Sequence, residues 1–517
     1  MPWGFMMNAL IRFVRRCGWG VALVLGAVPA LAQELPALRI DPTQITTSGI
    51  SSGAYMAVQF GVAHSATVSG VAATAGGPYF CAGRDARGGM AVGRVIARCM
   101  QGDPAMPAVP IGRAEQAEMA AATRAWAAQG RIDPLAALAE QRVWLFHGYN
   151  DGIVKRPVVE ALRDWYGQFV PAGQVFFRND LRAAHAQISA SCAASGQEGA
   201  QCNPCAQAGG NFINTCADPA TGAERYDAAG AALQWFYGPL EGRVETSGLS
   251  GSVVAFDQRP YVRRDYLPLP ALRAALAETG YAYVPAACAA GEACRLHVAF
   301  HGCQQQAERI GLDFVRGAGF NEWADANRIV VLYPQATATR AVPITPLNPQ
   351  GCWDWWGYND FLFDAPGRYA TREGLQVSAV WRMVERLRAG GDAPLAAEPA
   401  AELMLRLADV TAEAAALTWA PVPGAASYRI EREEVEGAAA AHVFHVSAPP
   451  VADHGLAPER AYRYVLHALD AGGAPIGAAA ALQVRTARAA PACDPYYSLA
   501  DDRPVDARGR PAGAPCP

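Results

Sequence analysis

The chain has 517 residues, of which 51% are hydrophobic and 17% are charged. This length suits about two to four domains with a large core, and the composition excludes a largely disordered chain. The formal net charge of −4 gives no basic excess with which to bind nucleic acid, so that class of partner is excluded.

The first segment, residues 1–32, has the pattern of a secretory signal peptide. Arginines precede an apolar run at 18–30, and Ala30-Leu31-Ala32 forms an A-x-A cleavage site. The run is too short for a stable membrane anchor, so we expect export to the periplasm or out of the cell. Removing this segment takes away Cys17 and leaves an even number of the 13 cysteines. In an oxidising compartment these residues are expected to form disulfides.

Residues 33–392 alternate strand-like and helix-like segments, which predicts an α/β fold with a mainly parallel sheet. A Cys-, Gly- and Asn-rich stretch at 192–261 is expected to form loops beside this sheet. The expected strands are 45–48, 142–146, 175–177, 295–300 and 329–333, and the expected helices include 52–63, 113–128 and 371–388.

The first of these strand–helix junctions carries a G-x-S-x-G pentapeptide, Gly49-Ile50-Ser51-Ser52-Gly53. Glycines on both sides permit a sharp strand-to-helix turn that exposes the central hydroxyl, as in a nucleophile elbow. Ser51 is therefore the candidate nucleophile. The helix N-terminus beside it offers backbone N–H groups to a developing anion.

A serine nucleophile needs a histidine base and a carboxylate that orients the base. Asp151 follows the strand at 142–146, and His185 follows the next one at 175–177, which is the chain order of α/β-hydrolases. We therefore predict Asp151 and His185 as the partners of Ser51. Asp180 and Asp164 are the weaker rivals for the acid.

A loop that supplies an oxyanion N–H usually precedes the nucleophile, but too few residues lie before Ser51 to hold one. Two His-Gly pairs lie downstream. We interpret His147-Gly148 as part of the acid loop and His301-Gly302, which directly follows a strand, as the oxyanion loop. This placement predicts a circularly permuted fold. The N–H groups of Ser52 and Cys303 would form the hole, with His301 shaping the loop.

Aromatic residues are dense in the segment "GCWDWWGY". Such side chains suit either a core or a groove for an apolar chain of ester groups. Both readings stay open for each residue, and we expect at least one of them to contact substrate. The candidate substrate-binding residues are Trp353, Trp355, Trp356 and Tyr358.

The composition changes near residue 393, where a Pro/Ala-rich linker covers 393–401. Short alternating strands then fill 402–487, and Tyr462 in "GLAPERAYRY" has the pattern of a tyrosine corner. This region resembles a fibronectin type III module, so we expect a small all-β sandwich. A Pro/Gly-rich tail, 488–517, is too short for a core of its own.

Taken together, these motifs resemble the extracellular poly(3-hydroxybutyrate) depolymerases whose oxyanion histidine lies after the triad. The segments "TSGISSGAYMAVQF", "GYNDGIV", "AAHAQ", "LHVAFHGCQQ", "NEWADANRIVVLYPQA" and "GCWDWWGY" carry the resemblance over residues 45 to about 390. It implies a permuted α/β-hydrolase that cleaves polyester through an acyl-enzyme, with Ser51, Asp151 and His185 as triad and the Cys303 N–H in the oxyanion hole.

The expected function is thus that of a secreted serine esterase that hydrolyses a short-chain poly(3-hydroxyalkanoate), above all poly(3-hydroxybutyrate), to hydroxyacid monomers or oligomers, without a cofactor. The alternatives are a feruloyl or acetyl-xylan esterase and a non-catalytic polymer-binding protein. Cys202-x-x-Cys205 has the spacing of a zinc half-site, but the exported context favours disulfides and no metal. The predicted pairs are Cys81–Cys99, Cys288–Cys294, Cys303–Cys352 and Cys493–Cys516.

Overall fold

The computed structural model describes most of the chain after residue 33. The described residues are 34–83, 92–101, 109–192, 200–264, 267–340, 346–360, 367–392, 394–395, 403–437, 441–489, 496–498 and 503–505. The predicted signal peptide and the Cys493–Cys516 pair lie outside them. No helix in this part of the chain is both long and apolar enough to span a membrane.

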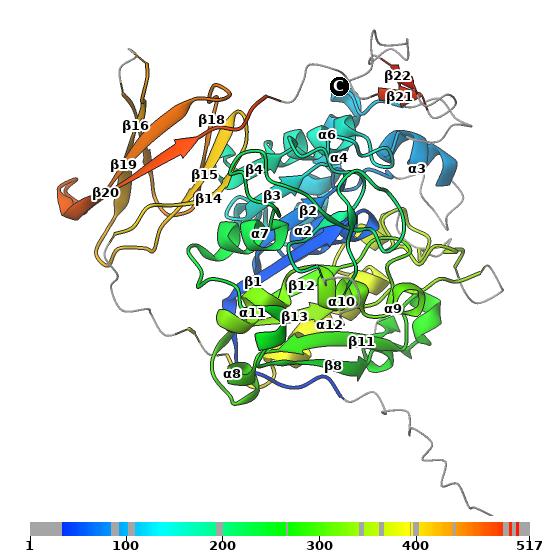
Figure 1. Cartoon of the computed structure of the whole chain (residues 1–517). Helices are drawn as coiled ribbons and strands as arrows, with labels where there is room; N and C mark the ends of the chain where they lie inside the picture. Colours follow the sequence, from blue (N-terminus) through cyan, green and yellow to red (C-terminus); the bar gives the residue numbers. More distant parts are fainter. Residues whose placement is uncertain are drawn as a thin grey trace, which may run out of the picture. The chain divides into compact units, whose positions relative to one another are not determined.

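A mainly parallel sheet forms the centre of the fold (Figure 1). Its strand order is β4-β3-β2-β1-β12-β13-β11-β8, in which only the pairs β13–β11 and β11–β8 are antiparallel, so that β11 alone runs against the other strands. The strands are β1 (Ile40–Ile50), β2 (Val68–Thr74), β3 (Arg142–Phe146), β4 (Val175–Arg178), β8 (Ser252–Asp257), β11 (Thr279–Val284), β12 (Cys294–Phe300) and β13 (Ile329–Tyr333).

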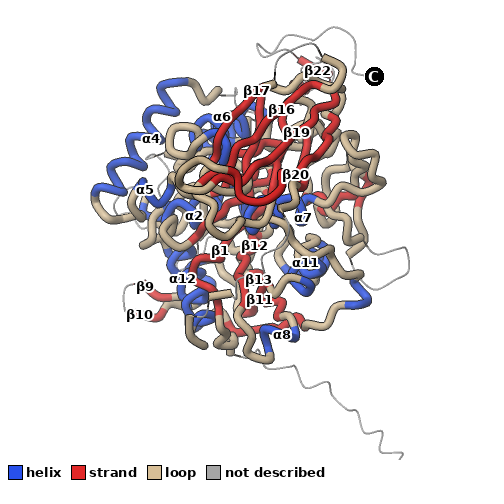
Figure 2. Tube along the Cα trace, turned by 90° about the vertical axis from the view of Figure 1, so that its left-hand side faces the viewer, coloured by secondary structure: helices blue, strands red, loops and turns tan. Residues whose placement is uncertain are grey.

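This order confirms the predicted α/β-hydrolase fold and its permutation. The strand that ends in the G-x-S-x-G turn, β1, is the first of the described strands, yet it lies between β2 and β12. Figure 2 shows β1 beside β12. The strand that leads into His301-Gly302, β12, therefore lies beside the elbow strand although it comes much later in the chain. In a non-permuted hydrolase the corresponding strand precedes the nucleophile strand in the chain.

Helices cover both faces of the sheet, because successive strand residues point to opposite sides. Val143 packs in the core shared with α2, α4, α6 and α12, whereas its neighbour Trp144 packs with α7. The longer helices are α2 (Ser52–Ala63), α3 (Val92–Cys99), α4 (Arg113–Ala128), α6 (Arg156–Tyr166), α7 (Ala228–Tyr237) and α12 (Leu375–Arg388); the short ones are α5 (Leu135–Leu138), α8 (Ala286–Ala289), α9 (Ala307–Ile310), α10 (Asp313–Gly317) and α11 (Asn321–Ala326).

Most predicted elements are present, with some differences. The helix expected at 371–388 begins only at Leu375, because Thr371–Gly374 forms a turn in which the N–H of Gly374 binds the carbonyl of Thr371. Strands β2, β8 and β11 were not predicted. In β2 the sequence VSGVAAT lacks both polar alternation and a long β-branched run, so its pattern does not single out a strand.

The C-terminal sandwich, residues 406–485, is antiparallel, as predicted for a fibronectin type III-like module. One sheet has the order β14-β15-β18 and the other β17-β16-β19-β20. The hydroxyl of Tyr462 accepts a hydrogen bond from the N–H of Ala457 at 2.9 Å, which confirms the tyrosine corner. The strands are β14 (Arg406–Val410), β15 (Ala414–Thr418), β16 (Ser427–Glu434), β17 (His442–Val446), β18 (Val451–His454), β19 (Ala461–Leu469) and β20 (Pro475–Arg485).

Candidate active site

Ser51 lies at the apex of a strained turn between β1 and α2. Its backbone has φ 55° and ψ −126°, a conformation that costs free energy in a non-glycine residue. A Cβ atom on Gly49 would lie 2.1 Å from the carbonyl oxygen of Gly53, and one on Gly53 would lie 2.3 Å from that of Phe300. Both glycines of the pentapeptide are therefore required, the first by the turn itself and the second by the approach of β12.

Asp151 and His185 form the hydrogen-bonded pair that the chain order predicts. Nδ1 of His185 lies 2.7 Å from Oδ2 of Asp151, and both side chains are buried. The other carboxylate oxygen accepts the N–H groups of Ile153 at 2.8 Å and Val154 at 3.0 Å. Burial alone would raise the pKa of Asp151, but the charge and hydrogen bond of His185 hold it below its usual value.

The loops that carry these two residues are joined backbone to backbone. The N–H of Tyr149 binds the carbonyl of Leu181 at 2.7 Å, and the N–H of Asn150 binds that of Ala183 at 3.0 Å. A Cβ on Gly148 would lie 2.3 Å from the carbonyl oxygen of Ala183, so this glycine permits the contact. The His147-Gly148 pair thus belongs to the acid loop, as expected.

The rival acids do not contact His185 in the structure. Asp164 is exposed on α6 and pairs with Arg163 at 2.7 Å. Asp180 is buried and pairs instead with Arg178 at 2.9 Å. Asp151 is therefore the carboxylate that the fold places against the histidine.

The loop after β12 lies directly beside the elbow. A Cβ on Gly302 would come within 3.3 Å of the Cβ of Ser51. His301 is buried, with Nδ1 2.7 Å from the carbonyl oxygen of Gly302 and Nε2 accepting the N–H of Ala336 at 3.1 Å. Burial lowers the pKa of His301 to about 4, so its ring is neutral near pH 7 and fixes the loop by hydrogen bonds.

Gln305 completes this loop and was not predicted from the sequence. Its Oε1 accepts the N–H of Gly302 at 2.7 Å, and its Nε2 donates to the carbonyls of Asn211 at 2.9 Å and Phe212 at 3.1 Å. The ring of Phe212 meets that of His185 edge to face, with centroids 6.2 Å apart. One buried amide therefore ties the loop beside Ser51 to the segment beside His185.

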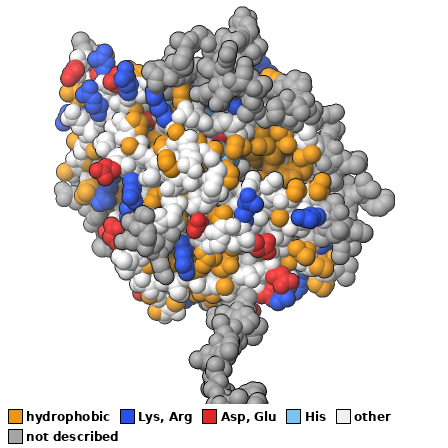
Figure 3. Space-filling model, turned by 45° about the vertical axis from the view of Figure 1, so that its right-hand side comes forward, with side chains coloured by type: hydrophobic (Ala, Val, Ile, Leu, Met, Phe, Trp, Pro, Cys, Tyr) orange, Lys and Arg blue, Asp and Glu red, His pale blue; other side chains and the backbone are white. Residues whose placement is uncertain are grey.

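A cavity of about 380 Å³ joins these parts. Its lining is mainly apolar, and a hollow bordered by hydrophobic side chains is visible on the face shown in Figure 3. Ser51 and His185 both face this cavity, together with Val92, Val95, Ile96, Met100, Ile153, Phe212, Gly302, Cys303, Gln305, Pro349, Trp355 and Trp356.

The aromatic segment divides between cavity and core. Trp355 and Trp356 line the cavity, whereas Trp353 and Tyr358, also predicted to bind substrate, do not. The carboxylate of Asp354 accepts N–H groups from Gly357, Tyr358 and Asn359, which curls the segment into a tight loop. The indole of Trp353 is directed inward. Its ring centroid lies 5.0 Å from that of Phe300 and 5.4 Å from that of His301.

Disulfides hold the cavity walls. Cys303–Cys352 joins the loop beside Ser51 to the aromatic segment, and Cys81–Cys99 fixes α3. These pairs and Cys288–Cys294 are as predicted. Cys202 and Cys205 bind Cys192 and Cys216, respectively, rather than a shared metal. Within the described residues, no group of His, Cys, Asp and Glu side chains is arranged to hold a metal ion.

Comparison with known proteins identifies close relatives, although no protein-family model matches the chain. It is 36% identical over 470 residues to a poly(3-hydroxybutyrate) depolymerase of Delftia acidovorans, covering 89% of this chain and 83% of that protein. It is 32% identical over 382 residues to a polyhydroxybutyrate depolymerase of Talaromyces funiculosus, covering 72% and 98%, respectively.

Solved structures agree with these relatives. The crystal structure of the depolymerase from Penicillium funiculosum matches with a TM-score of 0.56 at 31% identity, over 69% of this chain and 99% of that one. A serine-to-alanine depolymerase variant complexed with an R3HB trimer matches with a TM-score of 0.54 over the same shares. The elbow, the Asp–His pair and this relationship over most of both chains lead to one conclusion: the chain belongs to the poly(3-hydroxybutyrate) depolymerase family.

Proposed function

We propose that this protein is an exported serine esterase that hydrolyses poly(3-hydroxybutyrate) or its oligomers. The observation that carries the proposal is the shared apolar cavity, which is lined both by the strained Ser51 and by a histidine hydrogen-bonded to a buried carboxylate. A related depolymerase binds an R3HB trimer, which is the chemistry this cavity suits. The disulfides around the site support export, because such bonds persist in oxidising compartments.

The proposed reaction is a two-step acyl transfer. The Oγ of Ser51 attacks the ester carbonyl carbon while Nε2 of His185 takes the hydroxyl proton. Asp151 keeps the proton on Nδ1 and stabilises the charged imidazole. The tetrahedral intermediate expels the alcohol end of the polymer, which receives the proton from His185. Water, activated by His185, then attacks the acyl-enzyme and releases the free acid and Ser51.

The oxyanion is assigned to the backbone N–H groups of Ser52 and Cys303. Ser52 begins α2, whose N-terminus adds the positive end of the helix dipole. Cys303 belongs to the loop that packs against Ser51. Each such donor contributes roughly 3 kcal/mol in comparable sites. The hydrogen bond from the N–H of Gly302 to Gln305 leaves the next N–H, that of Cys303, as this loop's donor.

Trp355 and Trp356 are the proposed substrate contacts. Both line the cavity, and Trp355 is held by stacking on Tyr55 with ring centroids 4.3 Å apart. Rigid aromatic side chains give an apolar polyester a large contact area at a low entropic cost. Val95 and Ile96 of α3 and the following Met100 extend the apolar lining, which gives the repeat units on either side of the cleaved bond an apolar surface to contact.

Hydrolysis of amorphous poly(3-hydroxybutyrate) tests the proposal. We expect a suspension of the polymer to clear, with 3-hydroxybutyrate monomer or oligomers as products, and a methyl ferulate control to remain intact. A parallel arm with crystalline polymer establishes which physical state is attacked. Cleavage of the feruloyl ester alone would instead indicate a plant-polymer esterase. Binding of polymer without any product would indicate a non-catalytic protein.

Gln305→Ala is expected to lower the kcat for p-nitrophenyl butyrate by about 10- to 100-fold, because small displacements of reacting groups are costly. The variant frees the N–H of Gly302 and unties the loop from Phe212. Gln207→Ala is the matched control, because Gln207 is exposed and lies in the segment that also contains Asn211 and Phe212. A wild-type kcat in a less stable Gln305→Ala would limit this residue to a role in stability.

A further inference from the structure

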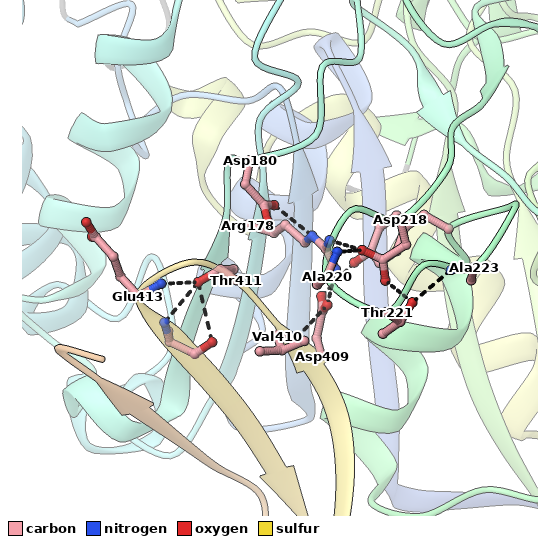
Figure 4. A network of polar contacts seen from close by, with 12 residues as sticks. Arg178, Asp180, Asp218, Ala220, Thr221, Ala223, Asp409, Val410, Thr411 and Glu413 are labelled. Carbon is pink, nitrogen blue, oxygen red and sulfur yellow. Dashed lines mark hydrogen bonds and ion pairs between the residues drawn. The ribbon is translucent and has the colours of Figure 1, made fainter. Parts of the chain in front are cut away.

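A fully buried arginine connects the sandwich to the α/β fold (Figure 4). Arg178, the last residue of β4, is 0% exposed and pairs with three carboxylates. Its Nε donates to Asp180 and its Nη2 to Asp218, both within the α/β fold. Its Nη1 donates to Asp409, which lies on β14 of the sandwich. All three carboxylates are nearly inaccessible to water.

Asp409 has a second side-chain partner in this cluster. The hydroxyl of Tyr226 donates to its Oδ2 at 2.6 Å, and the ring of Tyr226 lies 4.2 Å from the guanidinium carbon of Arg178. One cation faces three acids here, and burial raises the pKa of both Asp180 and Asp409. Loss of Arg178 would leave buried carboxylates without a cation, whereas loss of the Asp409 charge weakens the ion pair that joins the sandwich to Arg178.

Apolar contacts surround this polar centre. Ala414, Ala416 and Ala452 of the sandwich belong to one core cluster with Trp144 and Phe176 of the sheet. The small alanines allow the sandwich to approach these large rings closely. The sandwich also contacts the short 3-10 helix η1 (Ala172–Gln174) just before β4, where Nε2 of His454 lies 3.2 Å from the carbonyl oxygen of Ala172. A flexible spacer would share no such core, so these contacts indicate that the sandwich is docked on the α/β fold.

Arg178 is also the point from which the histidine loop departs. Its carbonyl accepts the N–H of His147 at 2.9 Å, which begins the ladder between the acid loop and the loop 179–185. The ladder continues at Leu181 and Ala183, just before His185. The side chain of Arg178 thus holds the sandwich while its backbone aligns the two loops that place Asp151 and His185.

We propose that the sandwich is required for full catalytic activity, because Asp409 and Arg178 act as positioning residues for the loop that carries His185. The inference rests on the proposed role of His185. Neither residue lines the cavity, so loss of their pairing displaces His185 without altering the substrate contacts. The effect is therefore expected in kcat and not in KM.

Asp409→Asn in the full-length protein tests the proposal, because it preserves shape and removes the charge. We expect kcat for p-nitrophenyl butyrate to fall about tenfold or more, with KM changed less than about twofold. The rate at which a fluorophosphonate labels Ser51 should fall by the same factor. Tyr226→Phe removes one hydroxyl from the cluster and should act in the same direction; it serves where Asp409→Asn does not fold.

Asp453→Asn is the matched control. Asp453 is a buried sandwich carboxylate that pairs with Arg432 at 2.8 Å and with the hydroxyl of Tyr464 at 2.8 Å, within the sandwich itself. We expect it to lower Tm while leaving kcat at the wild-type value well below Tm. Wild-type kcat and labelling rate in folded Asp409→Asn and Tyr226→Phe would overturn the proposal. So would a loss of kcat that simply follows Tm in all variants.

The failure of the proposed function gives a different result. In that case the wild-type protein itself neither cleaves the ester nor reacts with the fluorophosphonate at Ser51. If wild type is active and Ser51→Ala is not, the comparison of Asp409 with Asp453 decides the role of the sandwich alone.

Discussion

Ser51→Ala is expected to lower kcat for ester hydrolysis by about 10⁶-fold, to the background left by binding and the oxyanion groups. The substitution removes only the side-chain hydroxyl group. No other serine lies at the apex of the elbow to replace it. Because alanine fits the turn as well as serine does, the strained backbone at φ 55° is retained. The variant should therefore still bind polyester oligomers in the cavity.

Turnover of p-nitrophenyl butyrate and fluorophosphonate labelling measure this effect, with circular dichroism as the check on folding. Ser69→Ala on β2 is the control, since the hydroxyl of this serine donates to the carbonyl of Ile45 and does not line the cavity. Substantial turnover by Ser51→Ala, or labelling at another serine, would refute the assignment of the nucleophile.

Asp151→Asn should reduce kcat by about 10⁴-fold, although it changes the shape of the side chain little. The N–H groups of Ile153 and Val154 require an acceptor, so the amide oxygen will face them. The amide NH₂ then faces Nδ1 of His185, which can no longer carry a proton. The proton moves to Nε2, where the ring cannot accept the proton of Ser51.

Asp164→Asn is the control for this variant, because Asp164 is exposed and pairs only with Arg163 among the described residues. Its kcat should equal that of the wild type. We expect the rate of Asp151→Asn to recover in part at high pH, where hydroxide can take the serine proton. A wild-type rate at pH 7 would exclude Asp151 as the orienting acid.

Local sequence patterns were sufficient to locate the three proposed triad residues after strand ends. Ser51, Asp151 and His185 each follow a recognisable strand, and parallel strands bring such ends to one edge of the sheet. The position of His301-Gly302 after an apolar strand was equally readable. The permutation was predicted from the position of this pair downstream of Ser51, and the pairing of β12 with β1 agrees with it.

Other residues depend on contacts that no local pattern encodes. Gln305 is one of three consecutive glutamines, and only its long-range bonds to Asn211 and Phe212 distinguish it. Arg178 meets an aspartate 231 positions away. In the aromatic segment, the hydrogen bonds of Asp354 fix the loop that turns Trp355 and Trp356 toward the cavity. The amino-acid composition of the segment does not predict which rings face the cavity.

The position of β1 at the centre of the sheet has a kinetic consequence. The hydroxyl of Thr47 binds the carbonyl of Val298, 251 positions further along the chain. At a synthesis rate of about 5–20 residues per second, β1 waits roughly 10–50 s for this neighbour. Such high contact order slows folding. During this delay β1 has no β12 with which to pair, so the centre of the sheet closes only after most of the chain has been made.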